Sequence, residues 1–158
     1  MSKQANSRFC FVCGVENEHG LKVRFYNQEP GVVHAKCLIC EKHQGYPGVV
    51  HGGVVAAILD EVAGRTFMEG DPPKFMVTAK LTVRYRRPVP VGQPLLAIGK
   101  ALEDNERIAK ATAQLFGLDG TLLAEGDVVL AQLPRTMMET MKGAIEDWRV
   151  YPDSEVQR

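Results

Sequence analysis

A single apolar helix opened by two glycines constrains the fold of this 158-residue chain more than any other feature. His51-Gly52-Gly53 leads into the apolar run 54–59, and the helix is expected to continue to about Met68. A helix this apolar needs cover over most of its surface. Alternating apolar and polar residues predict that cover, as antiparallel strands over residues 74–87, 95–102, 107–118 and 121–133. One buried helix followed by a meander of strands indicates an α+β domain whose sheet wraps around the helix.

The segments on either side of this core also have readable patterns. Residues 20–26 and 32–39 predict a hairpin around the turn at Glu29-Pro30-Gly31. Residues 135–150 have the apolar spacing of a helix. The expected organisation is therefore an N-terminal segment with a C-x-x-C motif, one domain, and a C-terminal helix with its tail, over residues 1–19, 20–133 and 134–158.

The charge balance excludes some partners. Lys plus Arg and Asp plus Glu each number 19, so the formal net charge is zero. A zero total provides no general attraction to nucleic acid or to an anionic membrane surface. The first residues are polar rather than an apolar signal segment, and no apolar run is long enough to cross a bilayer. We therefore expect a cytoplasmic protein with neither nucleic acid nor a membrane as its partner.

The four cysteines form two C-x-x-C pairs, Cys10 with Cys13 and Cys37 with Cys40. This spacing is typical of a four-thiolate zinc site. The second pair, however, continues a predicted strand, in which residues three apart point to opposite faces. The first pair, followed by Gly14, has the pattern of a knuckle or tight loop. We expect reduced structural thiols and no metal, with a structural zinc ion as the alternative.

The start of the apolar helix has the properties of a site for a polarised carbonyl. Gly52 and Gly53 lack a Cβ, so a ligand can approach the N–H groups of the first turn, where the helix dipole favours negative charge. An oxyanion developing on a carbonyl needs such a donor. Asp60 follows eight residues later, and small residues on either side of it leave space for a substrate or a second helix: Ala56, Ala57, Ala63 and Gly64. We interpret this as an active-site helix; the alternative is that Asp60 is the buried partner of an arginine.

The spacing of these groups predicts a site shared between two chains. Eight residues of helix separate the Gly52 amide from Asp60 by about 12 Å, whereas reacting groups must approach to about 3–3.5 Å. Two such helices packed antiparallel bring the start of one beside the middle of the other. We therefore expect a homodimer or a dimer of dimers. A dyad of His51 with Asp60 within one chain is disfavoured, because the two residues lie on roughly opposite sides of the helix.

The same residues carry a family resemblance. The segment 48–53 (Gly-Val-Val-His-Gly-Gly), Asp60 nine residues after His51, and the strand from Thr78 that ends in residues 83–88 (Val-Arg-Tyr-Arg-Arg-Pro) form the pattern. This pattern resembles the hotdog-fold acyl-CoA thioesterases, specifically the PaaI-like (phenylacetate-type) branch, over about residues 20–133. The resemblance implies the hotdog fold, an antiparallel sheet wrapped around one long central helix.

The resemblance also implies roles for individual residues. Asp60 acts as general base on a water, or as nucleophile, and the Gly52 amide polarises the thioester carbonyl. Thr78 helps to position the carboxylate or the water; the alternative is an ordinary β-branched strand residue. Gln44 is the candidate for the amide side chain that assists at the carbonyl in many members, although Gly45 occupies the position that aligns with it. No cofactor is expected.

The remaining substrate-binding candidates lie at the helix entry and on the strand after the helix: His51, Gly53, Arg84, Arg86 and Arg87. His51 is expected to cap the helix rather than to act as a base. Alternate arginines beside a proline turn suit the phosphates of CoA, and an ordinary solvated face is the alternative.

The resemblance predicts an enzyme that hydrolyses acyl-CoA to free acid and CoA. A non-catalytic protein that binds or senses acyl-CoA on the same fold is the alternative, and Asp60 with Thr78 argues against it. A dehydratase would need a well-placed histidine, and none follows Gly52 in the sequence. Glu61 points about 100° away from Asp60 and is interpreted as a solvent or interface charge, with a share in the acid–base chemistry as the alternative.

Overall fold

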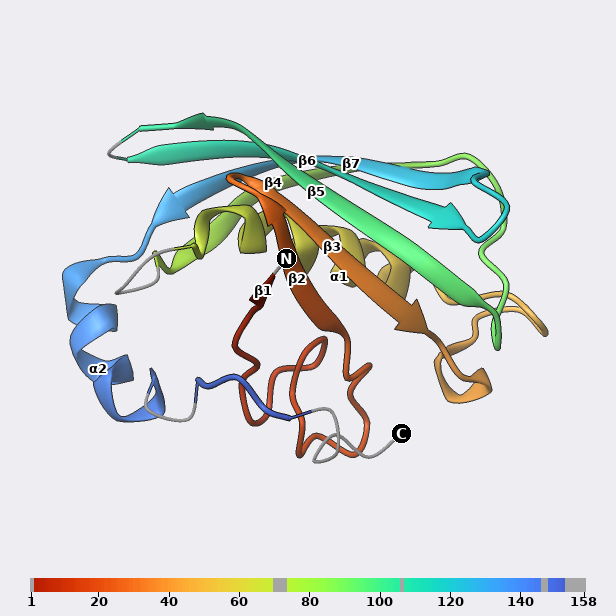
Figure 1. Cartoon of the computed structure of the whole chain (residues 1–158), viewed down its shortest axis with the longest axis horizontal. Helices are drawn as coiled ribbons and strands as arrows, with labels where there is room; N and C mark the ends of the chain where they lie inside the picture. The colour runs from red at the N-terminus through yellow and green to blue at the C-terminus, as the bar shows by residue number, and fades with distance from the viewer. Residues whose placement is uncertain (1, 70–73, 106, 146–147, 153–158) are drawn as a thin grey trace.

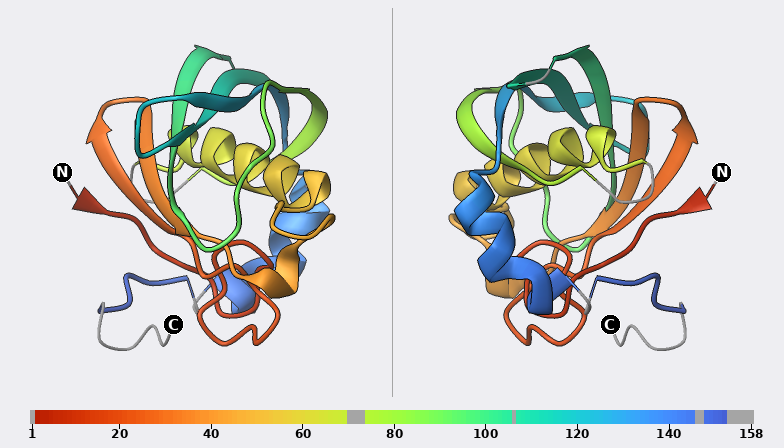
Figure 2. Two further views of the ribbon diagram at one scale, coloured as in Figure 1. Left: turned by 90° about the vertical axis from the view of Figure 1, so that its right-hand side faces the viewer. Right: turned by 90° about the vertical axis from the view of Figure 1, so that its left-hand side faces the viewer.

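The structure is a computed structural model that describes residues 2–69, 74–105, 107–145 and 148–152. Within these ranges a seven-stranded antiparallel sheet curves around one helix, α1 (Gly52–Gly64) (Figures 1 and 2). The strands are β1 (Ser2–Lys3), β2 (Arg24–Glu29), β3 (Val32–Leu38), β4 (Met76–Tyr85), β5 (Pro94–Asp104), β6 (Ile108–Gly117) and β7 (Leu122–Gln132). Two single turns of 3-10 helix, η1 (Glu41–His43) and η2 (Arg65–Phe67), and a second α-helix, α2 (Arg135–Ile145), complete the elements.

The strand order is β1-β2-β3-β5-β6-β7-β4. Strands β5, β6 and β7 form a meander as predicted, but β4, the first strand of the expected meander, does not pair with β5; β3 pairs with β5 instead. Strand β4, which directly follows the helix region in sequence, lies at the opposite edge from β1 and pairs with β7. The expected α+β hotdog architecture is therefore confirmed.

The core lies between α1 and the sheet. Val55, Ile58, Leu59, Val62 and Ala63 of α1 are all at most 1% exposed. The helix approaches β5 closely at Gly99, where an added Cβ would lie 2.3 Å from the backbone oxygen of Val62. A side chain at this position would therefore push α1 away from the sheet.

A β-bulge in β4 changes which side chains face the helix. The register with β7 shifts between Thr78, which pairs with Leu130, and Lys80, which pairs with Val129. Strict alternation would place Thr78 on the opposite face from Leu81, away from α1. Because the bulge adds one residue, Thr78 and Leu81 both face the helix.

The observed element bounds differ from the sequence-based expectations mainly at the ends. The long helix stops as an α-helix at Gly64 and continues as η2, and the first strand of the hairpin starts at Arg24 rather than Gly20. Helix α2 ends at Ile145; residues 146–147 of the expected helix lie outside the described residues. The structure also contains β1, which the sequence pattern did not predict because two residues carry no periodicity.

The N-terminal segment lies on the side of α1 that the sheet leaves uncovered (Figure 2). Strand β1 pairs with β2, and the loop that follows is held by backbone hydrogen bonds from Leu21 to Phe11 and from Val23 to Val12. This segment therefore belongs to the packed domain. In the described part of the chain, no helix is long and apolar enough to span a membrane.

Candidate active site

The two ends of α1 line two different cavities. A cavity of about 660 Å³ surrounds the start of the helix, and its lining includes His51, Gly52 and Tyr85. A smaller cavity of about 160 Å³ lies beside the second half of the helix, and its lining includes Asp60 and Thr78. The expected carbonyl-binding amide and the expected carboxylate of one chain therefore do not share a cavity.

The start of α1 presents one available amide. His51 is the N-cap, and its Nδ1 accepts the backbone N–H of Gly53 at 3.0 Å. This satisfies one of the first-turn donors and confirms the expected capping role. No hydrogen-bond acceptor for the N–H of Gly52 is present among the described residues. Gly52 is exposed, so its amide is available to a ligand carbonyl.

Tyr85 holds the start of the helix from β4, a contact that the sequence analysis missed. Its hydroxyl donates to the backbone oxygen of Gly52 at 2.7 Å. A Cβ added at Gly52 would lie 3.4 Å from the same hydroxyl, so a larger side chain there would press against Tyr85. The alternation of β4 places Tyr85 on the face toward α1, but sequence alone does not give its partner 33 residues away.

The arginines and Gln44 lie in different places. Arg86 and Arg87 line the larger cavity, and Arg86 also forms an ion pair with Glu125. Arg84 is exposed on the face of β4 opposite Tyr85 and is not part of that lining. Gln44 is outside the lining as well: its Oε1 accepts the Gly48 amide at 3.1 Å and closes the loop before the helix.

Among the described residues, one side-chain hydroxyl donates a hydrogen bond to the Asp60 carboxylate. Thr78 Oγ1 donates to Asp60 Oδ1 at 2.7 Å, because the bulge in β4 turns Thr78 toward the helix. Burial raises the pKa of Asp60 above its ordinary 3.8, the hydrogen bond from Thr78 lowers it, and the nearby Glu61 charge raises it again. The structure thus brings Asp60 and Thr78 together, and the carboxylate has lone pairs left to accept a proton.

The arginine-paired carboxylate on this helix is Glu61, not Asp60. Arg65, whose side chain is 1% exposed, donates from Nε and a terminal nitrogen to Glu61 Oε1, both at 3.0 Å. The guanidinium also lies over the rings of Phe25 and Trp148. Among the described residues Asp60 has no arginine partner, so the alternative interpretation of Asp60 as the buried partner of an arginine is wrong. Glu61, expected as a solvent or interface charge, is 21% exposed and paired with Arg65, so it is not a freely solvated charge; whether it also lies at an interface between chains stays a prediction.

The expected open space around Asp60 is only partly present. Ala56, Ala57 and Gly64 are half-buried on the side of α1 away from the sheet, whereas Ala63 is fully buried in the core. The correction for Ala63 follows from the 100° step of the helix, which turns residue 63 toward the sheet.

The four cysteines do not converge. Cys37 is buried on β3, as the strand pattern predicted, whereas Cys40 is exposed and lies beyond the end of that strand rather than on its opposite face. Among the described residues, the cluster of potential metal ligands consists of Cys10, Cys13 and Glu61, without the second pair.

Three comparisons with known proteins point to the same family. Residues 47–124 match the family model described as Thioesterase superfamily. Acyl-coenzyme A thioesterase THEM4 of Rattus norvegicus is 45% identical over 49 residues, 30% of this chain. A solved structure described as a thioesterase superfamily protein has a TM-score of 0.71 and 31% identity over 78% of this chain.

The region aligned with this chain is only part of the length of these two relatives. The aligned region covers 20% of the rat protein and 63% of the solved chain. A Streptococcus mutans UA159 structure bound to acetyl CoA has a TM-score of 0.64 and 18% identity, and the match covers 70% of this chain and 88% of that one. At that identity the likeness shows the fold alone.

The matched residues contain the segment that opens α1, the whole of α1, and β4 with its threonine and tyrosine contacts. The matched region, residues 47–124, therefore belongs to the thioesterase superfamily, and the chain has the hotdog fold.

Proposed function

We propose that the protein hydrolyses acyl-CoA thioesters to a free acid and CoA. The observation that carries this proposal is that α1 has both an exposed, available amide at Gly52 and a half-buried carboxylate at Asp60. Thr78 of β4 orients this carboxylate by a hydrogen bond. The similarity to acyl-coenzyme A thioesterase THEM4 supports the substrate class.

The chemistry is a general-base hydrolysis. The Asp60 carboxylate accepts a proton from water, and the resulting hydroxide forms a bond to the thioester carbonyl carbon. The oxyanion accepts the Gly52 N–H and is further stabilised by the positive end of the helix dipole. The C–S bond then breaks, and the CoA sulfur takes the proton from Asp60 as it leaves.

Each site is built from two chains in this proposal. Gly52 and Asp60 of one chain line different cavities, and eight helical residues separate them by about 12 Å. A second α1 packed antiparallel places its Asp60 near the first Gly52. Ala56, Ala57 and Gly64 are small and half-buried, which supports a close approach of the two helices.

The sheet edge next to this face supports the same assembly. Strand β4 pairs with β7 on one side, and Thr78 to Lys80 and Thr82 are exposed along it. A ten-residue edge strand with unpaired backbone groups is a template for pairing with another chain. Pairing of two β4 strands would extend the sheet across a homodimer, and two such dimers could form a tetramer.

The acyl-CoA activity is tested with a panel of short, long and aromatic acyl-CoA substrates. Released CoA is quantified by chromatography, because Cys40 is exposed and would react with a thiol reagent. We expect saturable hydrolysis of at least one class. Binding of CoA without hydrolysis of any substrate would instead support the non-catalytic acyl-CoA-binding alternative.

The shared site is tested by mixing two inactive variants. Asp60→Asn removes the base, and Gly52→Val blocks access to the amide. In a mixed dimer one site carries both defects and the other carries neither, so equal mixing and full exchange restore roughly a quarter of wild-type activity. No recovery in a mixture shown by native mass spectrometry to have exchanged would contradict the two-chain site.

A further inference from the structure

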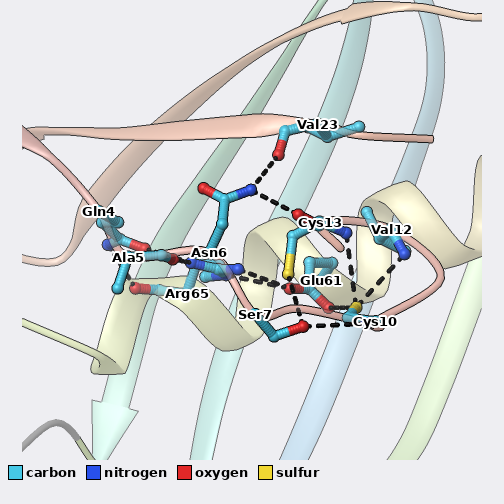
Figure 3. Close-up of polar contacts among 10 residues, drawn as sticks. All are labelled: Gln4, Ala5, Asn6, Ser7, Cys10, Val12, Cys13, Val23, Glu61 and Arg65. Atoms are coloured by element: carbon cyan, nitrogen blue, oxygen red, sulfur yellow. Dashed lines mark hydrogen bonds and ion pairs between the residues drawn. The ribbon is translucent and has the colours of Figure 1, made fainter. Parts of the chain in front are cut away.

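Cys10 and Cys13 form a thiol knuckle in the N-terminal segment (Figure 3). The Sγ of Cys10 accepts the backbone N–H of Val12 at 3.3 Å and of Cys13 at 3.5 Å. The Gly14 N–H closes the turn on the backbone oxygen of Cys10 at 2.8 Å. A Cβ added at Gly14 would lie 2.3 Å from that oxygen, so the turn requires glycine. The knuckle holds two sulfur atoms on one side of a rigid turn.

A carboxylate from α1 faces these two sulfur atoms. Glu61 Oε2 lies 3.8 Å from Cys10 Sγ, and the donor atoms of Cys10, Cys13 and Glu61 all lie within 4.8 Å of one another. In tetrahedral zinc sites the metal lies about 2.3 Å from sulfur and about 2.0–2.2 Å from a carboxylate oxygen, which puts donors roughly 3.5–3.8 Å apart. The three donors are therefore close to the spacing that a bound ion needs.

Groups outside the cluster hold each donor in place. Arg65 occupies Glu61 Oε1 with two N–H groups, which leaves Oε2 turned toward the sulfur atoms. Asn6 Nδ2 donates to the backbone oxygen of Cys13 at 2.6 Å, and Ser7 Oγ accepts the Cys10 N–H at 2.9 Å. Such partners orient ligands in metal sites, and mutating them typically lowers metal affinity about 10–100-fold.

We propose that Cys10, Cys13 and Glu61 bind a thiophilic divalent cation, which the donor set identifies as zinc, with the fourth position filled by water. Two thiolate donors favour zinc over magnesium or calcium, which bind oxygen ligands. The charges also balance: two thiolates, one carboxylate, the Arg65 cation and a divalent ion sum to zero. This proposal replaces the sequence-based expectation of a metal-free chain, because the third ligand comes from a helix 51 residues away.

The ion would connect two parts of the molecule. Cys10 and Cys13 lie in the N-terminal segment, and Glu61 directly follows Asp60 on α1. A metal bond between them would tie the segment to the active-site helix and add to its stability, because the ion binds the folded chain preferentially.

The proposal is tested first by metal analysis of fully reduced, tag-free protein after incubation with zinc and desalting. We expect about one zinc per chain, reduced below roughly a tenth in Cys10→Ser and Cys13→Ser. Cys40→Ser is the matched control. It removes an exposed thiol, 3.4 Å from His43 Nδ1, that could hold a loosely bound ion, and it should retain full zinc content.

A second measurement uses the wild-type chain, so that it does not depend on the folding of a variant. Cobalt in place of zinc should give the thiolate-to-cobalt charge-transfer and tetrahedral absorption bands. Zinc should protect Cys10 and Cys13, but not Cys40, from alkylation mapped by mass spectrometry. Less than about 0.1 zinc per reduced wild-type chain, loss of zinc in Cys40→Ser, or alkylation of Cys10 and Cys13 at the same rate with and without zinc would overturn the site.

Discussion

Asp60 and Glu61 are neighbours on α1, yet their carboxylates have opposite environments. Asp60 faces β4 and has one hydroxyl donor, from Thr78. Glu61 faces the N-terminal segment, where Arg65 donates twice to one oxygen and Cys10 lies beside the other. The 100° step between consecutive helical residues is enough to place them against different elements.

The comparison shows how the surroundings divide the roles of two similar side chains. A carboxylate with available lone pairs, oriented by one hydrogen bond, can accept a proton from water. A carboxylate that forms an ion pair with a buried guanidinium is stabilised in its ionised form, and the pair contributes to the stability of the folded chain. On this basis we expect Asp60 to control turnover and Glu61 to control stability.

The largest expected effect is on turnover in Asp60→Asn. The substitution removes the base while nearly preserving the shape of the side chain, so kcat should fall by at least about 10²-fold. Initial rates with the best acyl-CoA substrate measure this effect, and circular dichroism confirms that the variant is folded.

Glu61→Gln, assayed under the same conditions as Asp60→Asn, is the matched comparison. Its kcat should remain well above that of Asp60→Asn. An equal loss of kcat in the two variants would mean that Glu61 shares the acid–base step and that the proposed division between the carboxylates is wrong.

Much of the fold was predictable from local patterns. The apolar helix after His51, the hairpin around Gly31 and the meander after the helix all follow from periodicity and turn residues. These features depend on neighbours in sequence, which periodicity describes. The pairing order of the sheet depends on contacts between distant strands, and here it rested on the family resemblance.

The site was predictable only in part, because it also depends on contacts between residues that are distant in sequence. The capping role of His51 and the contact of Thr78 with Asp60 were expected, although the bulge in β4 that makes this contact possible was not. The ion pair of Glu61 with Arg65 fits a helical spacing of four residues, but burial of Arg65 under Trp148 depends on the C-terminal segment. Contacts between segments distant in sequence therefore determine that Glu61 is held by Arg65 and that Asp60 remains available to accept a proton.

The next largest effect is on stability in Glu61→Gln. Arg65 would remain buried without its carboxylate, which costs about 3–5 kcal/mol for a fully buried pair. Because 21% of the Glu61 side chain is exposed, we expect a smaller loss of unfolding free energy, about 2 kcal/mol. Urea unfolding followed by circular dichroism, with a chelator present to exclude any metal contribution, measures it.

Glu125→Gln provides the control for this stability measurement. It breaks the Arg86 ion pair, in which both side chains are at least 30% exposed, and should cost less than about 1 kcal/mol. Equal losses in the two variants would show that the buried position of Arg65 contributes nothing beyond an exposed pair.

The smallest expected effect tests how Asp60 is oriented. Thr78→Val removes the hydroxyl but keeps the β-branched shape, and the loss of one hydrogen bond of about 1 kcal/mol should lower kcat roughly 5-fold with little change in KM.

The pH profile of the same variant gives a second readout, because the direction in which its acidic limb moves is also predicted. Asp60 acts as a base only when ionised, so kcat/KM falls as pH drops through its pKa, which burial raises above 3.8. Because the Thr78 hydrogen bond lowers that pKa, Thr78→Val should move the acidic limb of the profile to higher pH, and Thr78→Ser should return it toward the wild-type position. A limb that stays in place in Thr78→Val, with kcat unchanged, would mean that the hydroxyl does not orient the carboxylate and that Thr78 serves the strand alone.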